Sequence, residues 1–85
     1  MSSISRATVR QMMQALLQRQ GKSLPADEGV RLQEIGFRSL DFAELALRVE
    51  TKLGGSMQFE TSVLRSIQTV RDVLDFMERA AADGS

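Results

Sequence analysis

The fold is decided by residues 35–53, which read IGFRSLDFAELALRVETKL. A turn containing glycine leads to a serine, and the residues after it repeat with the period of an α-helix. Five apolar side chains share an arc of about a third of the helix circumference, the width of a core face. These are Phe42, Leu45, Ala46, Val49 and Leu53. Leu40, Ala43 and Leu47 form a second strip, flanked by Glu44 and Arg48. A small bundle needs one buried face, so we expect the second strip to contact a partner.

Ser39 stands where this helix is expected to begin, and two roles are open to it. Serine is a favoured N-cap, because its hydroxyl accepts a hydrogen bond from a free amide of the first turn. The same free amides, with the positive end of the helix dipole, also favour a phosphate-bearing group attached at this position. Phe42, and not Glu or Gln, stands three residues after Ser39, so a reciprocal capping box around the serine is not expected.

The rest of the chain predicts three further helices around this one. Apolar periodicity indicates a first helix over about residues 5–19, followed by a long connection from 22 to about 35. A short third helix is expected near Thr61 or Ser62, and a fourth from Thr69 onward. The fold expected is therefore all-α, a small four-helix bundle with three longer helices, one short third helix and a long first loop. We expect one domain, residues 1–85, with its core in 5–80 and a frayed end at 81–85.

Composition narrows the possible functions. The 85 residues include no Cys and no His, so disulfides, thiolate metal ligands, imidazole ligands and the usual general base are all missing. We therefore expect neither a metal site nor an enzyme. The 11 basic and 11 acidic residues cancel, which gives no net charge to attract nucleic acid. No apolar run reaches the ~18 residues of a membrane span, and a cytoplasmic monomer is expected.

The basic residues are unevenly placed along the chain. Arg6, Arg10, Arg19 and Lys22 all precede the first acid, Asp27. They form either a basic patch or an ordinary solvated helix face. The second interpretation is favoured, because no aromatic residues or nucleic-acid-binding motif accompany them.

Two segments resemble the acyl and peptidyl carrier proteins. The first is Gly36-Phe37-Arg38-Ser39-Leu40-Asp41 with the run Glu44–Glu50, and the second is Ile67–Phe76, with its Thr-Val pair. Their spacing is similar to that of the family, over about residues 5–80. The resemblance implies an acyl-carrier-like bundle in which Ser39 carries a covalent 4′-phosphopantetheine arm. A phosphopantetheinyl transferase would supply this arm from coenzyme A, and its thiol would hold an acyl group as a thioester.

The resemblance also implies a surface for partner enzymes, namely an acyl- or aminoacyl-activating enzyme and downstream synthases or transferases. Leu40, Ala43 and Leu47 would provide apolar contact, and Asp41, Glu44 and Arg48 would select partners by charge. Phe37 is expected to be partly exposed beside the arm, and Met57 could line an adaptable groove.

Arg38 departs from the family, which usually has an acid before the serine. Residues 38–53 also balance three acids with three bases, whereas carriers of bacterial fatty-acid synthesis are typically very acidic. A specialised carrier, of a secondary-metabolite or other dedicated acyl pathway, therefore fits better than the general fatty-acid carrier.

Two alternatives remain open from the sequence. The cargo could be an amino acid or peptide, as in the peptidyl carriers. The chain could instead be a carrier-like helical adaptor that is never modified and acts only by docking.

Overall fold

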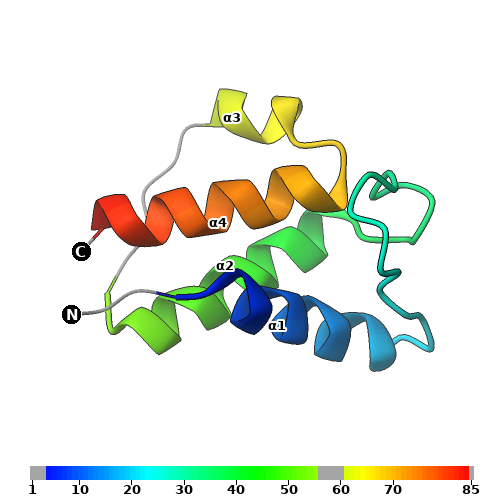
Figure 1. The fold of residues 1–85 in the computed structure, drawn as a ribbon, viewed down its shortest axis with the longest axis horizontal. Coiled ribbons are helices and arrows are strands. Elements are labelled where there is room, and N and C mark those ends of the chain that lie inside the picture. The colour runs from blue at the N-terminus through cyan, green and yellow to red at the C-terminus, as the bar shows by residue number, and fades with distance from the viewer. Residues whose placement is uncertain (1–3, 56–60, 85) are drawn as a thin grey trace.

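The computed structural model describes residues 4–55 and 61–84, which form four α-helices (Figure 1). The helices are α1 (Arg6–Gln18), α2 (Ser39–Leu53), α3 (Thr61–Ser66) and α4 (Val70–Gly84). This confirms the all-α prediction, with one short helix and a long loop between the first two. The radius of gyration, 12.0 Å, matches the ~12 Å of a compact domain of this length.

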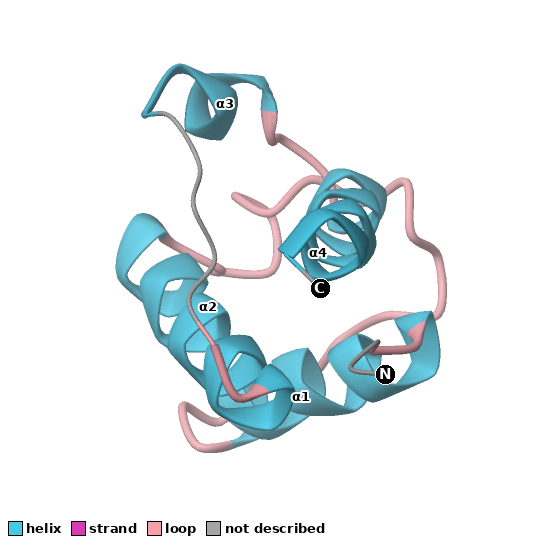
Figure 2. Cartoon of the chain, turned by 90° about the vertical axis from the view of Figure 1, so that its left-hand side faces the viewer, coloured by secondary structure: helices cyan, strands magenta, loops and turns pink. Residues whose placement is uncertain are grey.

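The core lies between α1, α2 and α4, each of which packs against the other two. Figure 2 shows these three helices around a common interior, with α3 set to one side. The predicted inner face of α2 is confirmed, because Phe42, Leu45, Ala46 and Val49 are buried and Leu53 is half-buried. The largest fully buried side chains are Val9, Met13, Leu17, Leu45, Val49, Val70, Val73, Leu74 and Met77. They come from all three long helices, so detaching any one of these helices from the core would expose apolar surface.

Side-chain caps fix where α1 and α4 begin. Ser5 caps α1, and its hydroxyl accepts a hydrogen bond from the amide of Thr8 at 3.2 Å. Thr69 and Asp72 satisfy each other's backbone amides at 3.0 and 3.2 Å, the reciprocal arrangement of a capping box. At its other end α4 continues to Gly84, and Ala81 is buried in the core. The fraying expected of residues 81–85 stays a prediction.

The long loop between α1 and α2 is fastened to the start of α4, at the end of the bundle where α2 also begins (Figure 1). The amides of Val70 and Arg71 donate to the carbonyls of Val30 and Glu28, at 3.1 and 2.8 Å. The first amides of a helix have no partner within the helix, so these loop carbonyls satisfy groups that would otherwise need water. The loop thereby completes α4, which explains why a connection of this length is ordered.

Gly36 ends this loop with a positive φ of 71°, where any other residue is strained. Gly36→Ala is expected to reduce the free energy of unfolding by about 1–2 kcal/mol, the usual cost of a left-handed conformation in an L-residue. Its added methyl would also meet the Lys22 side chain, which bonds the Gly36 carbonyl at 3.1 Å. Urea unfolding measures the loss. Gly55→Ala is the control, because Gly55 has no positive φ and open space around it, and a loss equal to that of Gly36→Ala would contradict the strain.

The basic side chains of α1 pair with acids from other elements. Arg6 contacts Glu28 of the loop and Asp75 of α4, each at 2.7 Å between nitrogen and oxygen, and also pairs with Glu78. Arg10 reaches Glu28 at 3.3 Å. These residues therefore form neither a free basic patch nor a simple solvated face. They join α1, the loop and α4, although each partly exposed pair contributes only about 0–1 kcal/mol.

Two carboxylates, Glu28 of this network and Asp72 of the α4 cap, make the stability of the fold depend on pH in a definite direction. The Arg6 hydrogen bond holds the pKa of Glu28 below its ordinary value, and the backbone amide of Gln68 does the same for the pKa of Asp72. A carboxylate with a lowered pKa stabilises the fold fully above its unfolded pKa, and this contribution is lost as the pH falls through the folded pKa. We expect the free energy of unfolding to decline below about pH 4.

The variant Glu28→Gln should show a shallower decline over the same range, measured by urea unfolding at a series of pH values. Glu34→Gln is the control, because Glu34 is exposed and has no ion pair among residues 4–55 and 61–84. Equal slopes for Glu28→Gln and the unaltered chain would show that the network does not act on stability.

Candidate functional site

The start of α2 is built without help from the Ser39 hydroxyl. Arg38, with extended backbone angles of −108° and 176°, occupies the cap position, and Ser39 is the first helical residue. The Asp41 carboxylate accepts a hydrogen bond from the backbone amide of Arg38 at 2.8 Å. The interpretation of Ser39 as the N-cap was therefore wrong. A carboxylate three residues after Arg38 supplies a charged acceptor at the positive end of the helix, so the hydroxyl is not needed there.

Ser39 is consequently exposed, and its hydroxyl takes part in no hydrogen bond with the part of the chain that the structure describes. Its backbone, by contrast, is held on both sides. Gly36 sets the direction of the incoming turn, and the hydrogen bond between Asp41 and Arg38 closes the first turn of α2. The result is a free nucleophilic oxygen on a fixed helix terminus.

Asp41, which was expected to help select partners by charge, is mostly buried. Only 9% of the residue is exposed, and its second oxygen accepts a hydrogen bond from the Gln20 side chain at 2.8 Å. Its charge is thus used inside the protein, to join the end of α1 to the start of α2. A protein bound at this surface would contact little of the Asp41 side chain.

The second apolar strip of α2, which we call the outer strip, is exposed as expected. It consists of Leu40, Ala43 and Leu47. Leu40 is 78% exposed and Leu47 is 62% exposed, and they are the large hydrophobic residues that stand out in solvent among the described residues. Exposed apolar side chains that share one face with a candidate attachment point are the kind of surface that binds other proteins.

The charged side chains beside the outer strip pair with one another. Glu44 accepts hydrogen bonds on one carboxylate oxygen from Arg19 of α1, at 3.1 Å, and from Arg48 of α2, at 3.2 Å. The predicted flanking pair Glu44 and Arg48 is therefore present, but it forms a triplet with Arg19 that the sequence did not indicate. With two arginines and one glutamate, the triplet keeps one net positive charge, whereas Glu44 and Arg48 alone would cancel.

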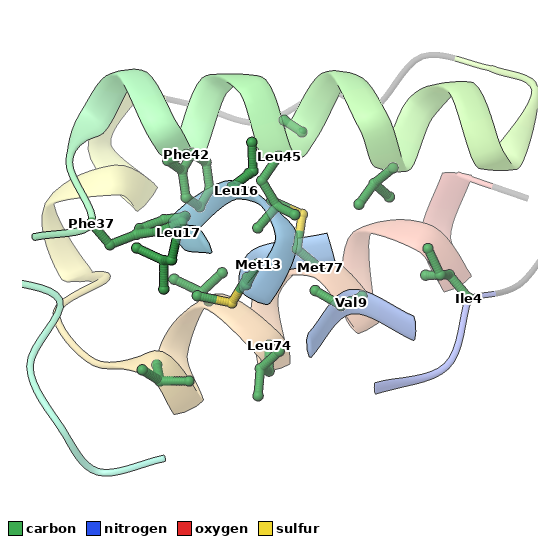
Figure 3. Packing of buried hydrophobic residues seen from close by; sticks show 14 of the residues in the cluster. Ile4, Val9, Met13, Leu16, Leu17, Phe37, Phe42, Leu45, Leu74 and Met77 are labelled. Carbon is green, nitrogen blue, oxygen red and sulfur yellow. The ribbon is translucent and has the colours of Figure 1, made fainter. Parts of the chain in front are cut away.

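Phe37 and Met57 were also expected near this surface. Phe37 is only 4% exposed, so the expectation that it lies partly exposed beside an arm was wrong. Figure 3 shows Phe37 and Phe42 at the same end of the core, and the Phe42 ring also lies 5.7 Å from that of Phe76. The turn at Gly36 directs Phe37 inward, while Arg38 and Ser39 face solvent. Met57 lies outside the described residues.

A hollow of about 830 Å³ opens beside Ser39, and we call it the Ser39 hollow. Its size is within the range of ligand pockets, roughly 300–1,000 Å³. Its walls come from the loop, the start of α2, and the segment from α3 to α4. The lining residues are Arg31, Leu32, Gln33, Gly36, Phe37, Arg38, Ser39, Phe42, Leu64, Ile67 and Gln68.

Sequence reasoning missed this hollow, because helix periodicity does not reveal how a loop and a short helix pack. The sequence signals were apolar residues outside the long helices, such as Leu32 of the long connection and Leu64 of the short third helix, which were expected to pack against the core.

Within residues 4–55 and 61–84, none of the helices could cross a membrane, and no three acidic side chains gather closely enough to hold a metal ion. None of the family models, curated proteins or solved structures compared with this chain matches it. What the site offers chemically is one uncovered hydroxyl, a helix N-terminus suited to an anion, an adjacent hollow and an exposed apolar strip.

Proposed function

We propose that this chain is an acyl carrier protein whose 4′-phosphopantetheine arm is attached to Ser39. The observation that carries the proposal is the Ser39 hydroxyl, which is exposed and unbonded at the start of α2, while Arg38 and Asp41 complete the cap. The sequence pattern around Ser39 and the resemblance of residues 67–76 to the same family support it. When bound, the arm supplies a thiol that holds the cargo as a thioester.

The residues around Ser39 fit the phosphate of such an arm. In forming the link, the Ser39 oxygen bonds to a phosphorus atom of coenzyme A, its proton leaves, and the bond to the departing nucleotide phosphate breaks. The resulting phosphodiester keeps a negative charge at the N-terminus of α2, where free amides and the helix dipole favour it. Arg38 adds a positive charge next to it. The neighbouring carboxylate, Asp41, is turned inward, where it accepts hydrogen bonds from the Gln20 side chain and the Arg38 amide.

The outer strip would then receive the enzymes that load and use the cargo. Leu40 is adjacent to Ser39 in sequence, so a partner seated on the strip would have the arm at its active site. Tethering raises the effective concentration of the cargo there. Because Glu44 is paired with both Arg19 and Arg48, this surface lacks the negative charge of an acidic second helix, and partners would rely on apolar contact with the strip. This supports a specialised acyl pathway rather than general fatty-acid synthesis.

Incubation with coenzyme A and a broad-specificity phosphopantetheinyl transferase, followed by intact-mass measurement, tests the proposal. The chain should gain one phosphopantetheine, and Ser39→Ala should gain none. The exposed outer strip would also serve an unmodified docking adaptor, and the absence of any gain with several transferases would favour that function. If the chain is modified, the adenylate-forming enzyme that loads it distinguishes an acyl carrier from an aminoacyl or peptidyl carrier.

A further inference from the structure

The Ser39 hollow combines an apolar interior with a one-sided charge. Its apolar lining is contributed by Leu32, Phe37, Phe42, Leu64 and Ile67. Its charged lining consists of Arg31 and Arg38, and no Asp or Glu among the described residues lines it. Both arginines are exposed, so they stand at the rim where the hollow opens to solvent.

The two rim arginines differ from those elsewhere on the described surface of α1 and α2. Arg6, Arg10, Arg19 and Arg48 each form an ion pair with an acid. The guanidinium groups of Arg31 and Arg38 make no ion pair or hydrogen bond with any residue in 4–55 or 61–84. Their positive charges and ten N–H donors in total are therefore available to a ligand that enters the hollow.

We propose that the Ser39 hollow binds a ligand with an apolar tail and a carboxylate head, and that Arg31 and Arg38 select it. The tail would lie against the five apolar side chains, which gain from burying it. The head would stay at the rim, where guanidinium groups bind carboxylates in planar, charge-assisted hydrogen bonds. A neutral head would forgo these bonds, and a cationic head would be repelled by both arginines. This selectivity goes beyond carriage, because it does not require Ser39 to be modified.

Titration of the unmodified chain tests this, with amide chemical shifts in NMR spectra as the readout. The probes are decanoate, decanol and decylamine, which share one tail and differ in head, and acetate, which has the head alone. Decanoate should bind at least about tenfold more tightly than decanol, as expected for one charge-assisted contact. Its shifts should fall on the residues that line the hollow. Decylamine and acetate should bind more weakly still.

The double variant Arg31→Gln/Arg38→Gln should remove the preference for decanoate over decanol. Both side chains are exposed and unpaired, so this variant should keep its fold, which circular dichroism checks. Arg79→Gln is the control for loss of charge away from the hollow, because it removes one positive charge, half of what the double variant removes, from an exposed position on α4 that does not line the hollow.

The proposal fails if decanol or acetate binds as tightly as decanoate, if the shifts lie away from the hollow, or if Arg79→Gln weakens binding equally. If the double variant does not fold, the comparison of the four probes on the unaltered chain still decides. A failure here leaves the proposed carriage untouched, because modification of Ser39 is read separately by mass.

Discussion

Leu45→Ala is expected to lower the free energy of unfolding by about 2–5 kcal/mol, the range for removing a buried leucine side chain. Leu45 is fully buried on the inner face of α2, where its loss leaves a cavity between the three long helices. A chain of 85 residues has a total stability of only roughly 4–13 kcal/mol, so the loss would be a large part of it. Urea unfolding followed by circular dichroism measures it.

Leu47→Ala is the matched control for this prediction. Leu47 lies on the same helix, two residues further on, and is 62% exposed. Its truncation should change the stability by no more than about 0.5 kcal/mol. If both variants lost the same stability, the assignment of one face of α2 to the core and the other to the outer strip would be wrong.

The second large effect is expected on the rate at which a transferase modifies the chain. Leu47→Asp should slow loading by a phosphopantetheinyl transferase by about tenfold or more while leaving the fold intact. An apolar contact at a protein interface is replaced by a charge that the partner would have to desolvate without pairing, which typically costs more than 1 kcal/mol. The measurement is kcat/KM for formation of the modified chain, with circular dichroism to verify folding.

Ala7→Asp provides the control for the loading measurement. It adds the same charge at an exposed position on α1, away from the outer strip, and should load at the rate of the unaltered chain. An unchanged rate for Leu47→Asp would contradict the assignment of the outer strip to partner binding. Equal slowing in both variants would indicate an effect of net charge alone.

The helices and the core faces could be predicted because they depend on local periodicity. The spacing of Val9, Met13 and Leu17 along α1 marks one side of a helix without reference to the rest of the chain. The predicted cap at Thr69 is equally local, since its hydroxyl accepts from an amide three residues away.

The errors arose where helix periodicity does not determine the surroundings of a side chain. Asp41 was assigned to the surface because its position in the helix does not show that Gln20 would donate a hydrogen bond to it. Gln20 lies just after α1, far from Asp41 in the sequence. Phe37 was placed outside because the direction of its side chain depends on the positive φ of Gly36. The N-cap of α2 was assigned to Ser39 because sequence rules do not point to Arg38. An arginine side chain cannot accept the hydrogen bond that N-cap side chains usually accept. The Ser39 hollow needs the packing of α3 and the loop, which no single segment encodes.

The central claim is that Ser39, and no other serine, receives a phosphopantetheine arm. The most direct measurement is peptide mass spectrometry of the transferase-treated chain, with fragmentation that assigns the added group to one residue. The account predicts a single modification on Ser39 and an unmodified Ser39→Ala chain. A modification on a different serine, such as Ser62 or Ser66 of α3, or a chain that no transferase modifies, would contradict it.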